Sequence, residues 1–185
     1  MVLANPSEFH ALGLVHAKVD QKFSAIAAAH AKHVHCRRGC HSCCLPNLTV
    51  SAIEAAQITA FVRADPELLA AVLASAAANP HAGTRCQLLS AQGDCLVYPV
   101  RPALCRSHGV PAWAPAEAAQ PAKWDVCPLN FVGIDVTQLP DARIGMPLVS
   151  QLLFVVGEQW RPQSSRVRVR LRVAELGLGR RNSSN

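Results

Sequence analysis

The side chains best suited to binding a ligand in this chain are its eight cysteines. Half of them stand within one short segment: Cys36, Cys40, Cys43 and Cys44. A Cys-x2-Cys loop turns two thiolates toward one point and leaves backbone amides free to donate hydrogen bonds to sulfur, as in zinc ribbons and iron–sulfur loops. The segment therefore predicts a metal centre, in which Cys40 and Cys43 form the chelating pair.

This segment is not expected to be a complete site by itself. Adjacent side chains point apart in most backbone conformations, so Cys43 and Cys44 either serve different ions, bridge two ions, or include one thiol that is not a ligand. The remaining ligands are expected from Cys86, Cys95, Cys105 and Cys127. A metal held in this way joins distant segments, which makes its binding part of folding. Eight thiols allow one centre with spare cysteines or two four-cysteine centres.

The alternative use of many cysteines is a set of disulfides. The first thirty-five positions contain Glu8, Lys18 and Asp20 and no apolar core, so we expect no secretory signal there. The longest apolar stretch, 148–157, is too short to cross a bilayer. The sequence therefore predicts a cytoplasmic protein without a membrane segment, where thiols stay reduced and clustered cysteines ligate metal.

Basic side chains flank the cysteines, at Arg37, Arg38, Arg101 and Arg106. Four thiolates around a zinc ion or a cubane leave a net negative charge, which guanidinium groups offset while lowering thiol pKa values. Arg101 and Arg106 are the candidate cofactor-binding residues, although exposed arginines without a role are equally compatible with the pattern. His41 and His108 stand beside cysteines and could replace a thiolate in a zinc site.

Apolar spacing predicts four helices, at 7–34, from Ser51, at 65–79 and at 145–160. Ser51 and Glu54 form a capping box, and Pro66 occupies the favoured first position of its helix. His16 and His30 fall on the apolar stripe of the first helix, where core or edge positions are expected.

The middle of the chain has a different pattern. Two short runs, 86–89 and 95–98, flank a turn-forming segment and predict a small hairpin. Arg101-Pro102 opens a turn of helix that carries Cys105. Prolines and alanines at 110–123 predict a surface loop.

The positive charge is concentrated at the C-terminal end. The chain has a net charge of +6, and residues 161–185 supply all of it with seven arginines and one glutamate. Arginine and apolar residues alternate at 166–173, which predicts either an edge strand or a disordered tail. Because no aromatic side chains are interleaved for base stacking, nucleic-acid binding is not favoured.

Together these features predict a mainly α fold, a small helical domain with a short β-hairpin that a multi-cysteine metal site staples together. The domain is expected to cover 1–160, with its cysteine core at about 36–130, and an arginine-rich strand or tail follows at 161–185.

The cysteine pattern resembles a known family. The run from Cys36 to Cys44, the segment from Cys95 to Arg106 with its Tyr98 and Arg-Pro-x-x-Cys-Arg element, and Cys127 are similar to the YkgJ-type cysteine-cluster family of zinc- or iron-chelating CxxCxxCC domains. The resemblance spans roughly 36–130, and all eight cysteines fall on the family's positions. The chain departs from the family's spacing with three residues, not two, between Cys36 and Cys40. The resemblance implies a metal or iron–sulfur protein and no substrate.

The sequence therefore supports an accessory, non-catalytic role for a metalloprotein that holds zinc or iron, the latter alone or as a 4Fe-4S cluster. An iron–sulfur enzyme is a second hypothesis, but no acid–base constellation beside the cysteines is recognisable. Metal storage or delivery is a third, because vicinal thiols suit metal exchange. The metal ion is the expected partner, and a protein partner is not indicated.

Overall fold

The computed structural model describes residues 6–37, 39–79, 85–116 and 121–179. Over these residues the fold is mainly α, as predicted. Its helices are α1 (His10–Ala29), α2 (Ala52–Arg63), α3 (Pro66–Ala78), α4 (Ala103–Ser107) and α5 (Met146–Trp160). Its strands are β1 (Thr49–Ser51), β2 (Ala112–Ala114), β3 (Lys123–Asp125), β4 (Ile144–Gly145) and β5 (Arg168–Arg170). None of the helices in the described part is both long and apolar enough to span a bilayer.

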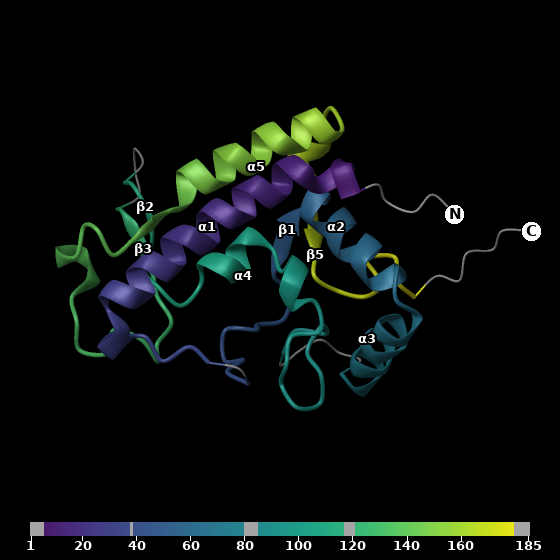
Figure 1. Cartoon of the computed structure of the whole chain (residues 1–185), viewed down its shortest axis with the longest axis horizontal. Helices are drawn as coiled ribbons and strands as arrows, with labels where there is room; N and C mark the ends of the chain where they lie inside the picture. The colour runs from purple at the N-terminus through teal and green to yellow at the C-terminus, as the bar shows by residue number, and fades with distance from the viewer. Residues whose placement is uncertain (1–5, 38, 80–84, 117–120, 180–185) are drawn as a thin grey trace, which may run out of the picture.

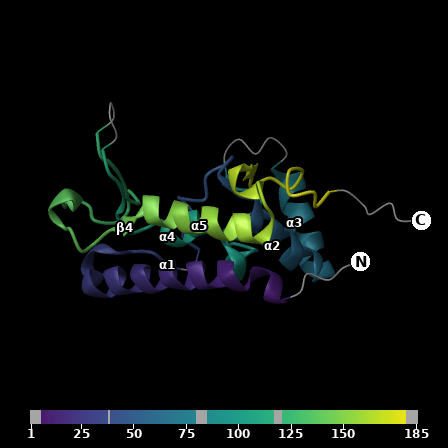
Figure 2. The same cartoon turned by 90° about the horizontal axis from the view of Figure 1, so that it is seen from above.

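The long helices α1 and α5 lie side by side, and the short helix α4 packs against α1 (Figures 1 and 2). Their facing side chains form a first hydrophobic core, which includes Leu12 and Ile26 of α1 and Leu153 of α5. The predicted first helix is shorter than expected, because 3-10 turns at Pro6–Phe9 and Ala31–His33 replace its ends. His16 is buried and His30 lies against the ring of Phe131, in keeping with the core or edge positions expected for them.

A second hydrophobic core joins α2 and α3 to the C-terminal segment. The strand β5 pairs antiparallel with β1, with Val169 opposite Val50. Beyond β5, the side chains of Leu171, Val173 and Leu176 are buried in this core. Of the two structures predicted for 166–173, the strand therefore forms, at Arg168–Arg170. The apolar residues that follow it are buried in the second core.

Two predictions for the middle of the chain were wrong in position. The segment 86–98 contains a single antiparallel bridge, Leu89 with Cys95, and then a 3-10 turn instead of a second strand. The hairpin forms at β2 and β3, inside the segment predicted as a loop, and β4 adds to it in parallel. There Trp113 faces Trp124 across the strands, and Arg143 stacks on Trp113 at 4.4 Å. Cross-strand aromatic pairs stabilise short strands that flanking prolines would otherwise disfavour.

A buried carboxylate connects the two cores. Glu54, near the start of α2, accepts hydrogen bonds from the backbone N–H and hydroxyl of Ser51, which forms the predicted capping box. Its other oxygen lies 2.8 Å from the backbone nitrogen of Ala103 and 3.4 Å from Nε2 of His16. One side chain therefore ties α1, α2 and the first turn of α4 together.

The pKa of Glu54 reflects this network. Burial alone would raise it, but the hydrogen bonds from His16, Ala103 and Ser51 outweigh burial and hold it below its ordinary value. The ionised carboxylate therefore contributes stability above the unfolded-state pKa, and this contribution is lost as the pH falls through the lower folded-state pKa.

We expect Glu54→Gln to lower the free energy of unfolding by about 1–3 kcal/mol at neutral pH, because an amide has one acceptor oxygen where the carboxylate has two, so a buried donor loses its partner. The difference from the parent protein should shrink below about pH 4.5, where the carboxylate of the unfolded chain is protonated. Urea unfolding followed by circular dichroism measures both effects. The control is Glu67→Gln, at an exposed position in the first turn of α3. Equal losses in the two variants would contradict the junction role.

Candidate metal centre

All eight cysteines lie within the described residues, and all eight are free thiols. They come from three loops and from α4, which carries Cys105. Backbone turns shape the first of these loops. Gly39 adopts a left-handed φ of +81°, and the N–H of Cys44 donates to the carbonyl of His41 at 2.9 Å. These turns place Cys40, Cys43 and Cys44 close together on one tight segment.

The thiol of Cys36 is fixed by a residue from the last loop. Nδ2 of the buried Asn130 lies 3.2 Å from Sγ of Cys36 and 2.6 Å from the carbonyl oxygen of Gly109. Oδ1 of Asn130 accepts a hydrogen bond from the backbone N–H of His35, and the backbone N–H of Asn130 donates to the carbonyl of Cys127. Asn130 therefore holds Cys36 and Cys127 in one neighbourhood, although they are far apart in sequence.

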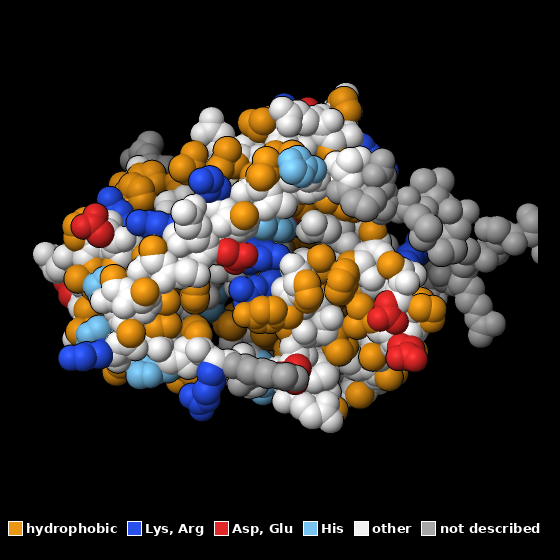
Figure 3. Space-filling model, viewed as in Figure 1, with side chains coloured by type: hydrophobic (Ala, Val, Ile, Leu, Met, Phe, Trp, Pro, Cys, Tyr) orange, Lys and Arg blue, Asp and Glu red, His pale blue; other side chains and the backbone are white. Residues whose placement is uncertain are grey.

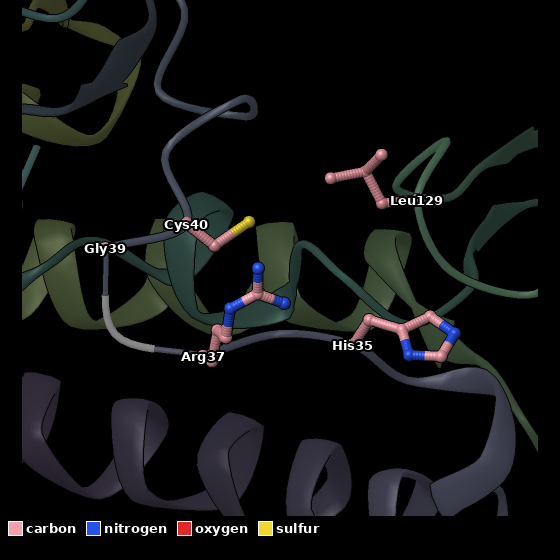
Figure 4. A pocket seen from close by; sticks show the side chains of 5 residues that line it. All are labelled: His35, Arg37, Gly39, Cys40 and Leu129. Carbon is pink, nitrogen blue, oxygen red and sulfur yellow. The ribbon is translucent and has the colours of Figure 1, made fainter.

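A cavity of about 440 Å³ opens beside Cys40. Its lining consists of His35, Arg37, Gly39, Cys40 and Leu129. Figure 4 shows the sulfur of Cys40 and the guanidinium of Arg37 pointing into the same space, which Leu129 faces from the opposite loop. Cys40 is thus reachable from the surface, and Cys36 is exposed as well.

A second group of thiols surrounds the junction of the first loop, the loop at 85–97 and α4. The N–H of Cys86 donates to the carbonyl of Cys44 at 2.8 Å, and Cys95 follows a turn that its bridge to Leu89 closes. Cys86, Cys95 and Cys105 all pack against the second hydrophobic core. Burial raises the pKa of all three thiols, to about 12 for Cys105. These thiols are therefore protonated at neutral pH unless a cation replaces their protons.

Cys43 and Cys44 interact directly with one another. The hydrogen bond from the Cys44 thiol lowers the pKa of Cys43 to about 6 and raises the pKa of Cys44. His108 and Arg101 also favour the Cys43 thiolate through their charge. Cys43 is therefore the more readily ionised thiol of the pair.

The two candidate arginines are placed differently. The guanidinium carbon of Arg101 lies 4.0 Å from the centroid of the Tyr98 ring, and its charge favours the thiolates of Cys43 and Cys95. Its buried Nε has no acceptor among the described residues, so a donor beside the thiols is left over for an anionic centre. Arg106 is buried and donates to Asp20 of α1 at 2.5 Å and to the carbonyls of Pro99 and Arg101.

The arrangement makes Arg106 a clamp between α1 and the segment before α4. Arg101 also lies near Asp20, with 3.7 Å between Nη2 and Oδ1, and it is the arginine whose charge acts on Cys43 and Cys95. Figure 3 shows basic side chains with an acidic one at a hollow in the middle of this face, where α4 lies in Figure 1. Arg37 lines the cavity, and Arg38 lies outside the described residues.

Neither histidine beside the cysteines is a member of a closed ligand set. The ring of His41 packs against Gly93, and Nδ1 of His108 lies 3.7 Å from Oδ2 of Asp125. In the described part of the chain, no three Cys, His, Asp or Glu side chains already converge as closely as a bound ion requires.

A search of known protein families matches residues 35–127 to the CxxCxxCC family, described as a "Putative zinc- or iron-chelating domain". The chain belongs to this family. The match covers half of the chain and includes all eight cysteines, so the predicted resemblance is confirmed and metal binding is the function that the family supports. Searches of curated proteins and of solved structures gave no match.

Two residues that shape this region were not predicted from the sequence. Asn130 is an isolated asparagine three residues after Cys127, and Asp20 is one acidic residue within a long helix. Neither belongs to a motif with known chemistry. Only the folded chain brings Asn130 to Cys36 and Asp20 to Arg106.

A substitution at Gly109 tests how closely the side chain of Cys36 packs against the backbone there. It has a φ of +119°, and a Cβ added there would lie 2.9 Å from Sγ of Cys36. We expect Gly109→Ala to destabilise the protein by more than Gly133→Ala, whose φ of +73° imposes strain of about 1–3 kcal/mol but whose surroundings are open. Urea unfolding compares the two variants. Faster alkylation of Cys36 should accompany the first change only, and equal behaviour would contradict the close packing.

Proposed function

We propose that this protein is a cytoplasmic, non-catalytic metalloprotein that holds zinc or iron through its clustered cysteines. The observation that carries the proposal is that eight free thiols stand on three loops and on α4, which contacts tie to one another: Asn130 joins Cys36 to the loop of Cys127, and Cys86 is hydrogen-bonded to Cys44. Thiolate donors suit zinc or an iron–sulfur cluster and disfavour magnesium or calcium. Family membership supports the same assignment.

The eight cysteines are the proposed ligands, and Arg101 is the proposed electrostatic partner of the bound centre. A metal bound here would cross-link the first loop, the loop at 85–97, α4 and the loop at Cys127. The chain itself supplies the rest of the function. It orients the thiols through Asn130 and Gly39, surrounds Cys105 with the second core, and places a positive charge beside Cys43 and Cys95. Raised thiol pKa values imply that binding releases protons and weakens as the pH falls.

Metal delivery is a second candidate, favoured by one observation. The thiol of Cys40 faces an open cavity, where a donor or acceptor thiol could reach a bound ion. An iron–sulfur enzyme has less support, because no paired acid and base groups line this cavity among the described residues.

Metal analysis of protein purified without oxygen tests the proposal. We expect bound metal by mass spectrometry. An absorption band near ~400 nm would indicate thiolate-bound iron, and a colourless protein with zinc would indicate a chelating site. Removing the metal with a chelator should loosen the cysteine loops, which proteolysis can follow. A fully folded protein that neither contains nor takes up metal would falsify the proposal.

Replacing Arg101 tests its electrostatic role. We expect Arg101→Met to weaken zinc binding about fivefold, because the loss of one positive charge near the thiolates costs about 1 kcal/mol. Arg143→Met is the matched control, since Arg143 also stacks on an aromatic ring, that of Trp113. Competition with a coloured zinc chelator measures both affinities. An unchanged zinc affinity in Arg101→Met would contradict the electrostatic role and leave Arg101 only its packing against Tyr98.

A further inference from the structure

The thiols divide between two different environments in the fold. Cys86, Cys95 and Cys105 pack against the second core, built from α2, α3, β1 and the C-terminal segment. Cys127 is followed by Phe131, which is buried in the first core with residues of α1 and α5. The two groups of thiols therefore rest on separate structural units, with the first loop running between them.

Hydrogen bonds give the same division. Asn130 joins Cys36 to Cys127, and Leu129 of that loop shares a cavity with Cys40. The backbone hydrogen bond between Cys86 and Cys44 joins the first loop to the thiols at the second core. The β-bridge between Leu89 and Cys95 holds Cys95 in the same group.

We propose that the chain builds two metal centres of different lability. The outer centre consists of Cys36, Cys40, Cys43 and Cys127. The inner centre consists of Cys44, Cys86, Cys95 and Cys105. The inner centre holds a structural ion, and the outer centre holds an ion that exchanges with thiol ligands in solution. This inference rests on the proposed metal-binding function and deepens it.

Local geometry assigns Cys43 to the outer centre. Cys40 and Cys43 have the two-residue spacing at which a loop turns both sulfurs toward one ion. Cys43 and Cys44 are adjacent, and a single ion bound by both would close a strained ring. Placing them in different centres gives each centre four thiolates and makes the peptide between them the connection of the two sites.

Access differs between the two centres. Cys36 is exposed, and Cys40 faces the cavity together with Arg37 (Figure 4). Arg37 places a positive charge where an incoming thiolate or carboxylate ligand would approach. Cys127 is buried, so access to the outer centre is through Cys36 and Cys40. Within the inner set no thiol is exposed, and Cys105 lies on a helix held by both Glu54 and the second core. Exchange therefore begins at the outer centre.

Zinc stoichiometry and release provide the test. The full-length protein is loaded with zinc without oxygen, counted by native mass spectrometry, and then mixed with a coloured chelator. We expect two zinc ions per chain and two release phases of equal amplitude, the first at least tenfold faster. Cys36→Ser should lose the fast phase and keep one ion. Cys95→Ser should lose the slow phase and keep the fast one.

A measurement on the unaltered protein covers the case in which Cys95→Ser does not fold. After chelation of one zinc ion, iodoacetamide should modify Cys36 and Cys40 first, and peptide mapping should find the four inner cysteines protected. One zinc ion per chain, a single release phase, or simultaneous modification of all eight thiols would overturn the two-centre assignment and leave the proposed function standing. Failure to bind any zinc or iron would instead remove the proposed function.

Discussion

The position of the cysteines depends on how α4 is held between two cores. The carboxylate of Glu54 fixes the first turn of α4 to α2 and, through His16, to α1. Arg106 of α4 adds a second link to α1 through Asp20. Because Ala103 is buried in the first core and Cys105 packs against the second, this short helix forms the boundary between them. A thiol on such a boundary reaches loops that belong to either core.

Thiols brought this close together resist ionisation in the absence of a cation. Burial is the main cause of the raised pKa values of Cys86 and Cys105, and the charges of neighbouring thiolates add to it. The chain offsets part of this cost with Arg101 and with the hydrogen bond between Cys44 and Cys43. The rest of the free-energy cost of ionising the thiols stays uncompensated within the chain. A bound cation would offset it, because the cation replaces several thiol protons at once.

Local signals in the sequence were sufficient for most helices. The capping box at Ser51, the proline at Pro66 and the turn before Cys105 specify structure within a few residues, so they were predicted correctly. The hairpin was misplaced because its strands are only three residues long and depend on Trp113 meeting Trp124 and on β4. Such pairing is set by tertiary contacts that spacing alone does not encode.

The site shows the same limit in a sharper form. Cysteine spacing predicted the family and its metal-binding function, because thiolate chemistry is specific. It could not show that Cys127 lies near Cys36, because the hydrogen bonds of Asn130 that bring them together form only in the folded chain. One amide side chain thus links two thiols that stand far apart in the sequence. In the proposed division into two centres, a residue that is not itself a ligand helps to decide which thiols share an ion.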